Sequence, residues 1–84
     1  MRDYQISICQ AIVNKRTWGG NNTVVQTEKG VTKIYFYGNL IGVVNHGDET
    51  VKCDNCGYNT ASTTARINAI KDAGIELGYK IIGE

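Results

Sequence analysis

The chain has 84 residues and a hydrophobic fraction of 42%, which predict one folded domain over residues 1–84 and exclude a disordered protein. Nine basic and eight acidic residues give a net charge of +1, and the two signs are interleaved, which argues against the basic stripe typical of strong nucleic-acid binding. No apolar run approaches the roughly 20 residues of a membrane span, and residues 1–4 lack the apolar stretch of a signal peptide. We therefore expect a cytoplasmic protein without a membrane partner.

The first predicted element is a helix over residues 3–15. Its apolar side chains recur at the spacing of one helical face, at Ile8, Cys9, Ile12 and Val13. Asp3 is a suitable N-cap. The glycines and asparagines of residues 19–22 end the helix and form a linker.

Strands are predicted next, because short β-branched and aromatic runs alternate with turn residues. The runs cover residues 23–27, 31–37, 40–45 and 50–53. Their short connections indicate a four-stranded antiparallel meander. A second helix follows at residues 61–73, with the hydroxyl of Thr60, Ser62 or Thr63 to cap its start and Gly74 to end it. Residues 79–82 are expected to form a short C-terminal strand. The predicted fold class is α+β.

The central hairpin is expected to turn at Gly38-Asn39, since a type I′ turn needs positive φ at both central positions. This turn would pair Tyr37 with Leu40, Phe36 with Ile41, Tyr35 with Gly42, and Ile34 with Val43. Alternation along the strands then assigns the side chains to two faces. The core face would hold Ile34, Phe36, Ile41 and Val43, and the opposite face Lys33, Tyr35, Tyr37, Leu40 and Val44.

This opposite face is the predicted partner-binding surface, because exposed tyrosines offer large contact areas at low entropic cost. Arg66 is a further candidate, since it lies one turn into a helix whose hydroxyl-rich start could hold an anion. Two structural alternatives stand beside this hypothesis. A helix could cover the tyrosine face, and Arg66 could tie its helix to the preceding loop.

The cysteines permit a metal hypothesis. Cys53 and Cys56 form a C-x-x-C followed by Gly57, which is half of a zinc knuckle, and His46 and Cys9 could complete four ligands. The usual second ligand pair is absent, so we expect no cofactor and keep zinc as the alternative. A Cys–His nucleophile pair lacks a third orienting group. We therefore predict no catalytic residues and no enzymatic activity.

Several segments resemble a small domain of unknown function found in bacteriophage proteins. They read GNNTVV from Gly20, YFYGNLI from Tyr35, CGYNT from Cys56 and TTARINAI from Thr63. The resemblance covers about residues 10–70 and implies phage origin without a known enzymatic activity. A full C-x-x-C is not general in the pattern. The residues that match it are Trp18, Asn22, Gly38, Asn39, Gly57, Tyr58, Thr60, Thr64, Arg66 and Asn68.

Size, mixed charge and the resemblance together predict a non-enzymatic phage accessory protein. Its partner would be a host protein or nucleoprotein complex in the host cytoplasm, and inhibition of a bacterial defence system, as by anti-CRISPR proteins, is the expected role. The alternative is a small nucleic-acid-binding module that uses the same sheet face with Lys33, Lys52 and Arg66. The oligomeric state, a dimer included, is left open.

Overall fold

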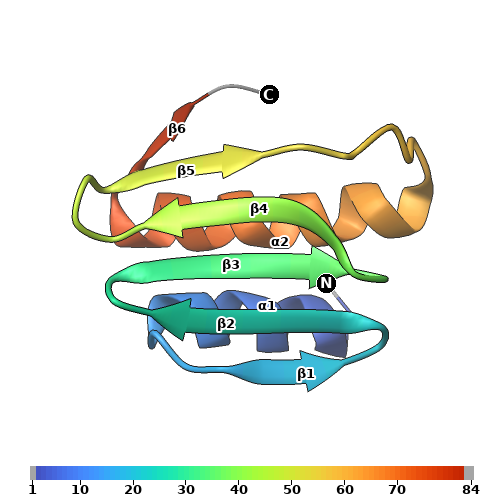
Figure 1. Cartoon of the computed structure of the whole chain (residues 1–84), viewed down its shortest axis with the longest axis horizontal. Helices are drawn as coiled ribbons and strands as arrows, with labels where there is room; N and C mark the ends of the chain where they lie inside the picture. The colour runs from blue at the N-terminus through green and yellow to red at the C-terminus, as the bar shows by residue number, and fades with distance from the viewer. Residues whose placement is uncertain (1, 83–84) are drawn as a thin grey trace.

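The structure is a computed structural model that describes residues 2–82 as an α+β fold (Figure 1). A six-stranded sheet has its strands in chain order, and every neighbouring pair is antiparallel except β5–β6. The helices are α1 (Asp3–Val13) and α2 (Ala61–Leu77). The strands are β1 (Trp18–Gly20), β2 (Thr23–Glu28), β3 (Val31–Phe36), β4 (Asn39–Asn45), β5 (Thr50–Cys53) and β6 (Lys80–Ile82).

Both helices lie side by side on the same face of the sheet (Figure 1). Helix α1 packs against β1 and β2, whereas α2 packs against β4, β5 and β6. Helix α2 connects β5 to β6, and a helical crossover of this kind is what lets two consecutive strands run parallel. The opposite face of the sheet has no helix from residues 2–82 over it.

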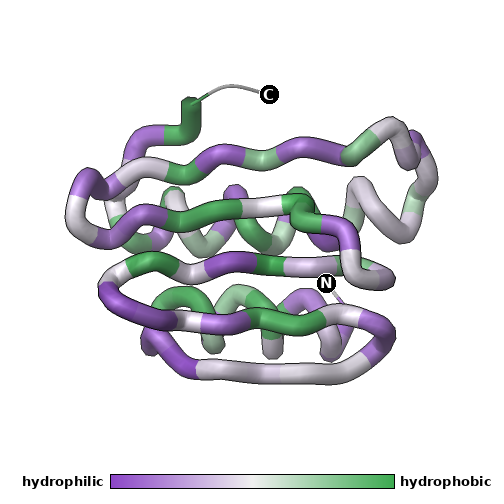
Figure 2. The backbone as a smooth tube through the Cα atoms, in the orientation of Figure 1, coloured by the Kyte–Doolittle hydropathy of each residue, from purple (hydrophilic) through white to green (hydrophobic). Residues whose placement is uncertain are grey.

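The hydrophobic core fills the single layer between the sheet and the helices. Strand β2 illustrates this arrangement, because its side chains alternate between the buried face toward the helices and the exposed face over Thr23–Glu28. Figure 2 shows green apolar segments of the strands and helices between purple polar stretches. The largest fully buried apolar side chains are Ile8, Ile12, Val25, Ile34, Ile41, Val44, Val51 and Ile70.

The central hairpin exists, but its predicted turn and register are wrong. The residues between β3 and β4 are Tyr37 and Gly38, whose φ angles of 51° and 79° both lie in the left-handed region, so the turn is one residue earlier than expected. The side-chain Nδ2 of Asn39 stabilises the turn by donating to the carbonyl oxygen of Phe36 at 3.3 Å. Tyr35 therefore pairs with Leu40, and Phe36 with Asn39.

A β-bulge at Ile41 then shifts the pairing of β3 and β4 by one residue. Leu40 pairs with Tyr35 and Gly42 with Ile34, so Ile41 is the extra residue and still points into the core. Beyond the bulge, Val44 pairs with Thr32 and is fully buried. Val43 pairs with Lys33 on the face of the sheet opposite the helices. The predicted faces of Val43 and Val44 are thus wrong, because the bulge reverses them.

Other elements also differ from prediction. Strand β1 was not expected. Helix α1 begins at Asp3 and ends at Val13, so Asp3 is its first residue rather than its cap. Helix α2 continues through Gly74 to Leu77 and ends at Gly78, whose φ of 77° provides the left-handed C-cap. The expected hydroxyl cap of α2 is confirmed, and of the three candidates it is Thr60, whose hydroxyl accepts from the Thr63 backbone amide at 3.2 Å.

Gly74 lies inside α2 because the helix approaches β5 closely there. A Cβ atom at this position would lie 2.6 Å from Cγ2 of Val51, which is fully buried. We therefore expect Gly74→Ala to lower the free energy of unfolding by about 1–3 kcal/mol, although alanine has the higher helix propensity. Urea denaturation measures this change.

Gly19→Ala is the control, because its Cβ would meet nothing closer than a backbone oxygen at 3.9 Å. Val51→Ala should partly restore stability to Gly74→Ala in a double-mutant cycle. A stabilising Gly74→Ala would show that the contact is not tight.

Candidate functional site

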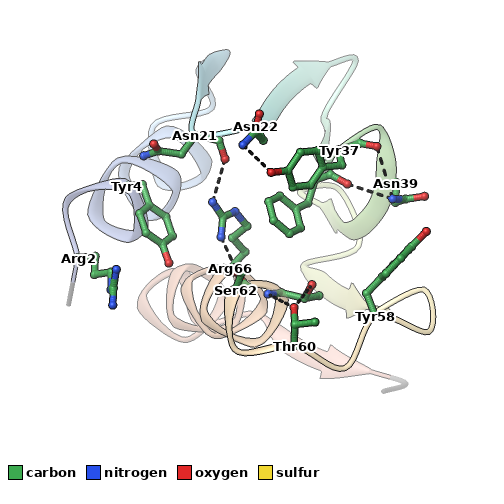
Figure 3. Close-up of a pocket in the computed structure, with 12 residues that line it drawn as sticks. Arg2, Tyr4, Asn21, Asn22, Tyr37, Asn39, Tyr58, Thr60, Ser62 and Arg66 are labelled. Atoms are coloured by element: carbon green, nitrogen blue, oxygen red, sulfur yellow. Dashed lines mark hydrogen bonds between the residues drawn. The ribbon is translucent and has the colours of Figure 1, made fainter.

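Two surfaces carry the residues that the sequence singles out. The first is the side of the sheet opposite the helices, which we name the open sheet face. The second is a cleft at the end of the molecule where both helices begin, which we name the end cleft (Figure 3).

The open sheet face consists of three cross-strand rows. The row nearest the end cleft is Val24, Tyr35 and Leu40. The middle row is Gln26, Lys33, Val43, Lys52 and Ile82. The far row is Glu28, Val31, Asn45, Thr50 and Lys80. Three lysines and one glutamate give these rows a net charge of +2.

The apolar side chains of this face are well exposed for aliphatic residues. Val24 is 40% exposed, Leu40 39% and Ile82 37%. Its lysines, at 33, 52 and 80, are exposed and form no ion pair with any residue in 2–82. The alternative that a helix covers this face is therefore wrong for the described part of the chain.

The structure separates the predicted binding residues. Lys33, Tyr35 and Leu40 share the open sheet face. Val44 is fully buried in the core. Tyr37 and Arg66 line the end cleft instead, because Tyr37 belongs to the β3–β4 turn and Arg66 points from α2 toward the start of β2.

The end cleft has a volume of about 890 Å³, within the usual range for ligand pockets. Its walls come from the starts of α1 and α2, the β1–β2 and β3–β4 turns and the loop before α2. None of its lining residues is acidic. They are Arg2, Tyr4, Asn21, Asn22, Phe36, Tyr37, Asn39, Tyr58, Thr60, Ser62, Thr63 and Arg66.

Arg66 is the centre of this site and is only 6% exposed. Its Nε donates to Thr23 Oγ1 at 2.7 Å, and its two terminal nitrogens donate to the carbonyl oxygens of Ser62 at 2.9 Å and Asn21 at 2.8 Å. The guanidinium carbon lies 4.4 Å from the ring centre of Tyr4 and 4.0 Å from that of Phe36. Figure 3 shows the guanidinium of Arg66 beside the ring of Tyr4.

The charge of Arg66 is buried without an anionic partner. Burial of a charge is costly unless other groups compensate it. Here the compensation comes from three neutral oxygen acceptors and two aromatic faces, and Arg66 forms no ion pair within residues 2–82. Arg66 has the expected structural role, but the prediction that it ties its helix to the preceding loop is wrong, because its hydrogen bonds join α2 to Thr23 of β2 and Asn21 of the β1–β2 turn.

Tyrosines and asparagines form the outer walls of the cleft. Tyr37 is 68% exposed and its hydroxyl accepts from Nδ2 of Asn22 at 2.9 Å, and its ring centre lies 4.7 Å from that of Phe36. Tyr58 is 54% exposed. One sequence signal pointed to this site, namely a single arginine behind a hydroxyl-rich helix start, but Tyr4, Asn21 and Tyr58 were not predicted to belong to it.

The four candidate zinc ligands are not brought together. Cys9 is on α1, Cys53 is buried at the end of β5, and the thiol of exposed Cys56 donates to the Leu40 carbonyl at 3.2 Å. Among residues 2–82, no three His, Cys, Asp or Glu side chains are placed to share a metal ion. Burial, and then the charges of Glu76 and Asp72, raise the pKa of the Cys9 thiol, which favours the thiol over the thiolate that a metal would need.

His46 connects β3 to the residue that precedes β6. Its Nε2 lies 2.7 Å from Thr32 Oγ1 and its Nδ1 lies 3.0 Å from the Tyr79 hydroxyl. Desolvation, followed by the positive charge of Lys15, lowers the pKa of His46 below its ordinary value of 6.5. The neutral imidazole can donate at one nitrogen and accept at the other, which suits two hydroxyl partners.

None of the helices within residues 2–82 is long and apolar enough to cross a membrane.

Comparison with known proteins gives one result. A family model described as Kyanoviridae Gp96 protein, a bacteriophage protein family, matches residues 1–82. No curated protein and no solved structure matches the chain. The expected phage relationship is thereby confirmed, and the individual motifs of the resemblance remain predictions.

Arg66→Lys tests the structural role of the guanidinium. Lysine keeps the charge but lacks the planar fork that reaches three acceptors and stacks between two rings. We expect the free energy of unfolding to fall by about 2–4 kcal/mol, as measured by urea denaturation. Arg16→Lys, at an exposed position after α1, should change it by less than about 0.5 kcal/mol. Equal effects of the two substitutions would contradict the role assigned to Arg66.

His46 should make stability depend on pH. Its pKa is lower in the folded than in the unfolded chain, so the unfolded chain takes up the proton first as the pH falls. The stabilisation is therefore complete above about pH 6.5 and is lost as the pH falls through the folded pKa. His46→Gln should flatten the unfolding free energy between about pH 7.5 and 5. Identical slopes for variant and parent would rule out this contribution.

Proposed function

The chain belongs to the Kyanoviridae Gp96 protein family of bacteriophages, and we propose that it is a non-enzymatic accessory protein that binds an acidic surface of a host protein through the open sheet face. One observation carries this proposal: the exposed aliphatic side chains of the face share it with exposed lysines that have no acidic partner among residues 2–82.

The arrangement has the two parts of a protein-binding surface. Val24, Tyr35 and Leu40 form an apolar row that a partner can cover. Lys33 and Lys52 flank Val43 in the next row and would meet carboxylates at the margin of the contact. Charge complementarity of this kind mainly speeds association and fixes orientation.

A protein fits this face better than nucleic acid or a second copy of the chain. Sheets that bind single strands stack bases on several aromatic rings, and the three rows contain one aromatic residue, Tyr35. A second copy docked face to face would bring two lysine-bearing surfaces together, which costs free energy. An acidic protein surface satisfies both the apolar row and the lysines.

Inhibition of a host defence system, as anti-CRISPR proteins perform, is the biological role we propose for such binding. The support for this role is the small size of the chain and its phage family. A stoichiometric inhibitor needs a binding face but no catalytic group, which agrees with the predicted absence of enzymatic activity.

Site-specific photo-crosslinking tests the proposed face. A benzophenone amino acid at Val24 or Leu40 should capture a host protein from lysate, and Lys33→Glu with Lys52→Glu should reduce the yield at least about tenfold through charge repulsion. The crosslinked peptide of the host protein should lie in an acidic region. The matched control carries the probe at Ile75, which is 66% exposed on α2 and should give no specific product.

The outcome that overturns the proposal is capture that survives the double charge reversal. Loss of the product after nuclease treatment would instead favour the nucleic-acid alternative. A crosslink between two copies of the chain would favour a dimer through this face.

A further inference from the structure

The end cleft combines aromatic planes with cationic groups and has no acidic residue in its walls. Four of its side chains are aromatic, and two of these, Tyr37 and Tyr58, are more than half exposed. They come from different segments, the β3–β4 turn and the loop before α2, so a planar group between those segments has exposed ring surface available to it (Figure 3).

The cationic part of the cleft is suited to an anion. The guanidinium of Arg66 has five N–H groups, and three of them are used in its hydrogen bonds, which leaves two. Arg66 is nine-tenths buried and has no ion pair within the described chain. A phosphate group in the cleft would accept hydrogen bonds from it and offset its buried charge. Arg2 adds a second, exposed cation to the same walls.

Two amide side chains complete the set of contacts. Asn22 and Asn39 use their Nδ2 groups in hydrogen bonds to the Tyr37 hydroxyl and to the β3–β4 turn. Both residues line the cleft, and their Oδ1 atoms accept no hydrogen bond from residues 2–82. They can accept from the amino group of a base, since amide side chains read base edges in this way.

We propose that the end cleft binds a nucleoside phosphate unit, with the base against Tyr58 and Tyr37 and the phosphate toward Arg66 and Arg2. A neutral ligand would leave the charge of Arg66 uncompensated, and inorganic phosphate would leave the exposed rings unused. The unit can be a free nucleotide or part of a single-stranded nucleic acid, which share this chemistry.

Calorimetric titration of the full chain tests the proposal with adenosine 5′-monophosphate (AMP), adenosine, inorganic phosphate and an oligoadenylate of about 12 nucleotides. AMP should bind at least about tenfold more tightly than adenosine or phosphate alone. Tighter binding of the oligoadenylate than of AMP would identify a single strand as the source of the unit, and the reverse order a free nucleotide.

Two cleft variants avoid the risk that changing Arg66 unfolds the protein. Tyr58→Ala should weaken AMP binding about tenfold, because it removes a stacking ring that is not part of the core. Arg2→Gln should weaken it about threefold or more. The matched controls are Ile75→Ala, for loss of an exposed apolar side chain, and Arg16→Gln, for loss of an exposed charge outside the cleft.

Three results would overturn the proposal: no binding of AMP or oligoadenylate at about 5 mM, equal binding of adenosine or phosphate, or equal weakening in cleft and control variants. The outcome is independent of the proposed function. The variant with Lys33→Glu and Lys52→Glu should bind AMP like the parent, because these residues lie outside the cleft.

Discussion

The buried guanidinium of Arg66 is the interaction on which one whole end of this molecule depends. It joins α2 to the start of β2 through Thr23, and it is held between a ring from α1 and a ring from β3. An arginine can do this because its flat cation stacks on aromatic faces while its edge donates hydrogen bonds. The positions of both helix starts relative to the sheet are therefore fixed around one positive charge.

The two candidate surfaces follow from the same layer arrangement. Both helices cover one face of the sheet, so the opposite face is left to side chains such as Leu40 and Lys33. Both helices also begin at the end of the sheet where the β1–β2 and β3–β4 turns lie, and the end cleft forms between these segments. One surface is apolar and lysine-rich, the other aromatic and arginine-centred, which is why different ligand classes suit them.

Local sequence signals predicted most elements but not their details. The α+β class, both helices, the four central strands and a hydroxyl cap on α2 were predictable, because each depends on nearby residues. The hairpin register was not, because Tyr37 occupies a left-handed conformation unusual for a bulky residue and a bulge then reverses the faces of Val43 and Val44. Gly74 was predicted to end α2, because no neighbouring residue in the sequence indicates its close contact with Val51 of β5. The end cleft was missed for the same reason, since Arg66 contacts residues more than 40 positions away.

We propose that Arg66 both organises the end cleft and provides its anion-binding group. The most direct measurement is an NMR titration that follows the side-chain N–H resonances of Arg66 together with the backbone amides while AMP is added. We expect shifts at Arg66 and around Tyr58, with no change at Lys33 or Lys52. Shifts confined to the open sheet face, or AMP binding that leaves the Arg66 side chain unchanged, would contradict it.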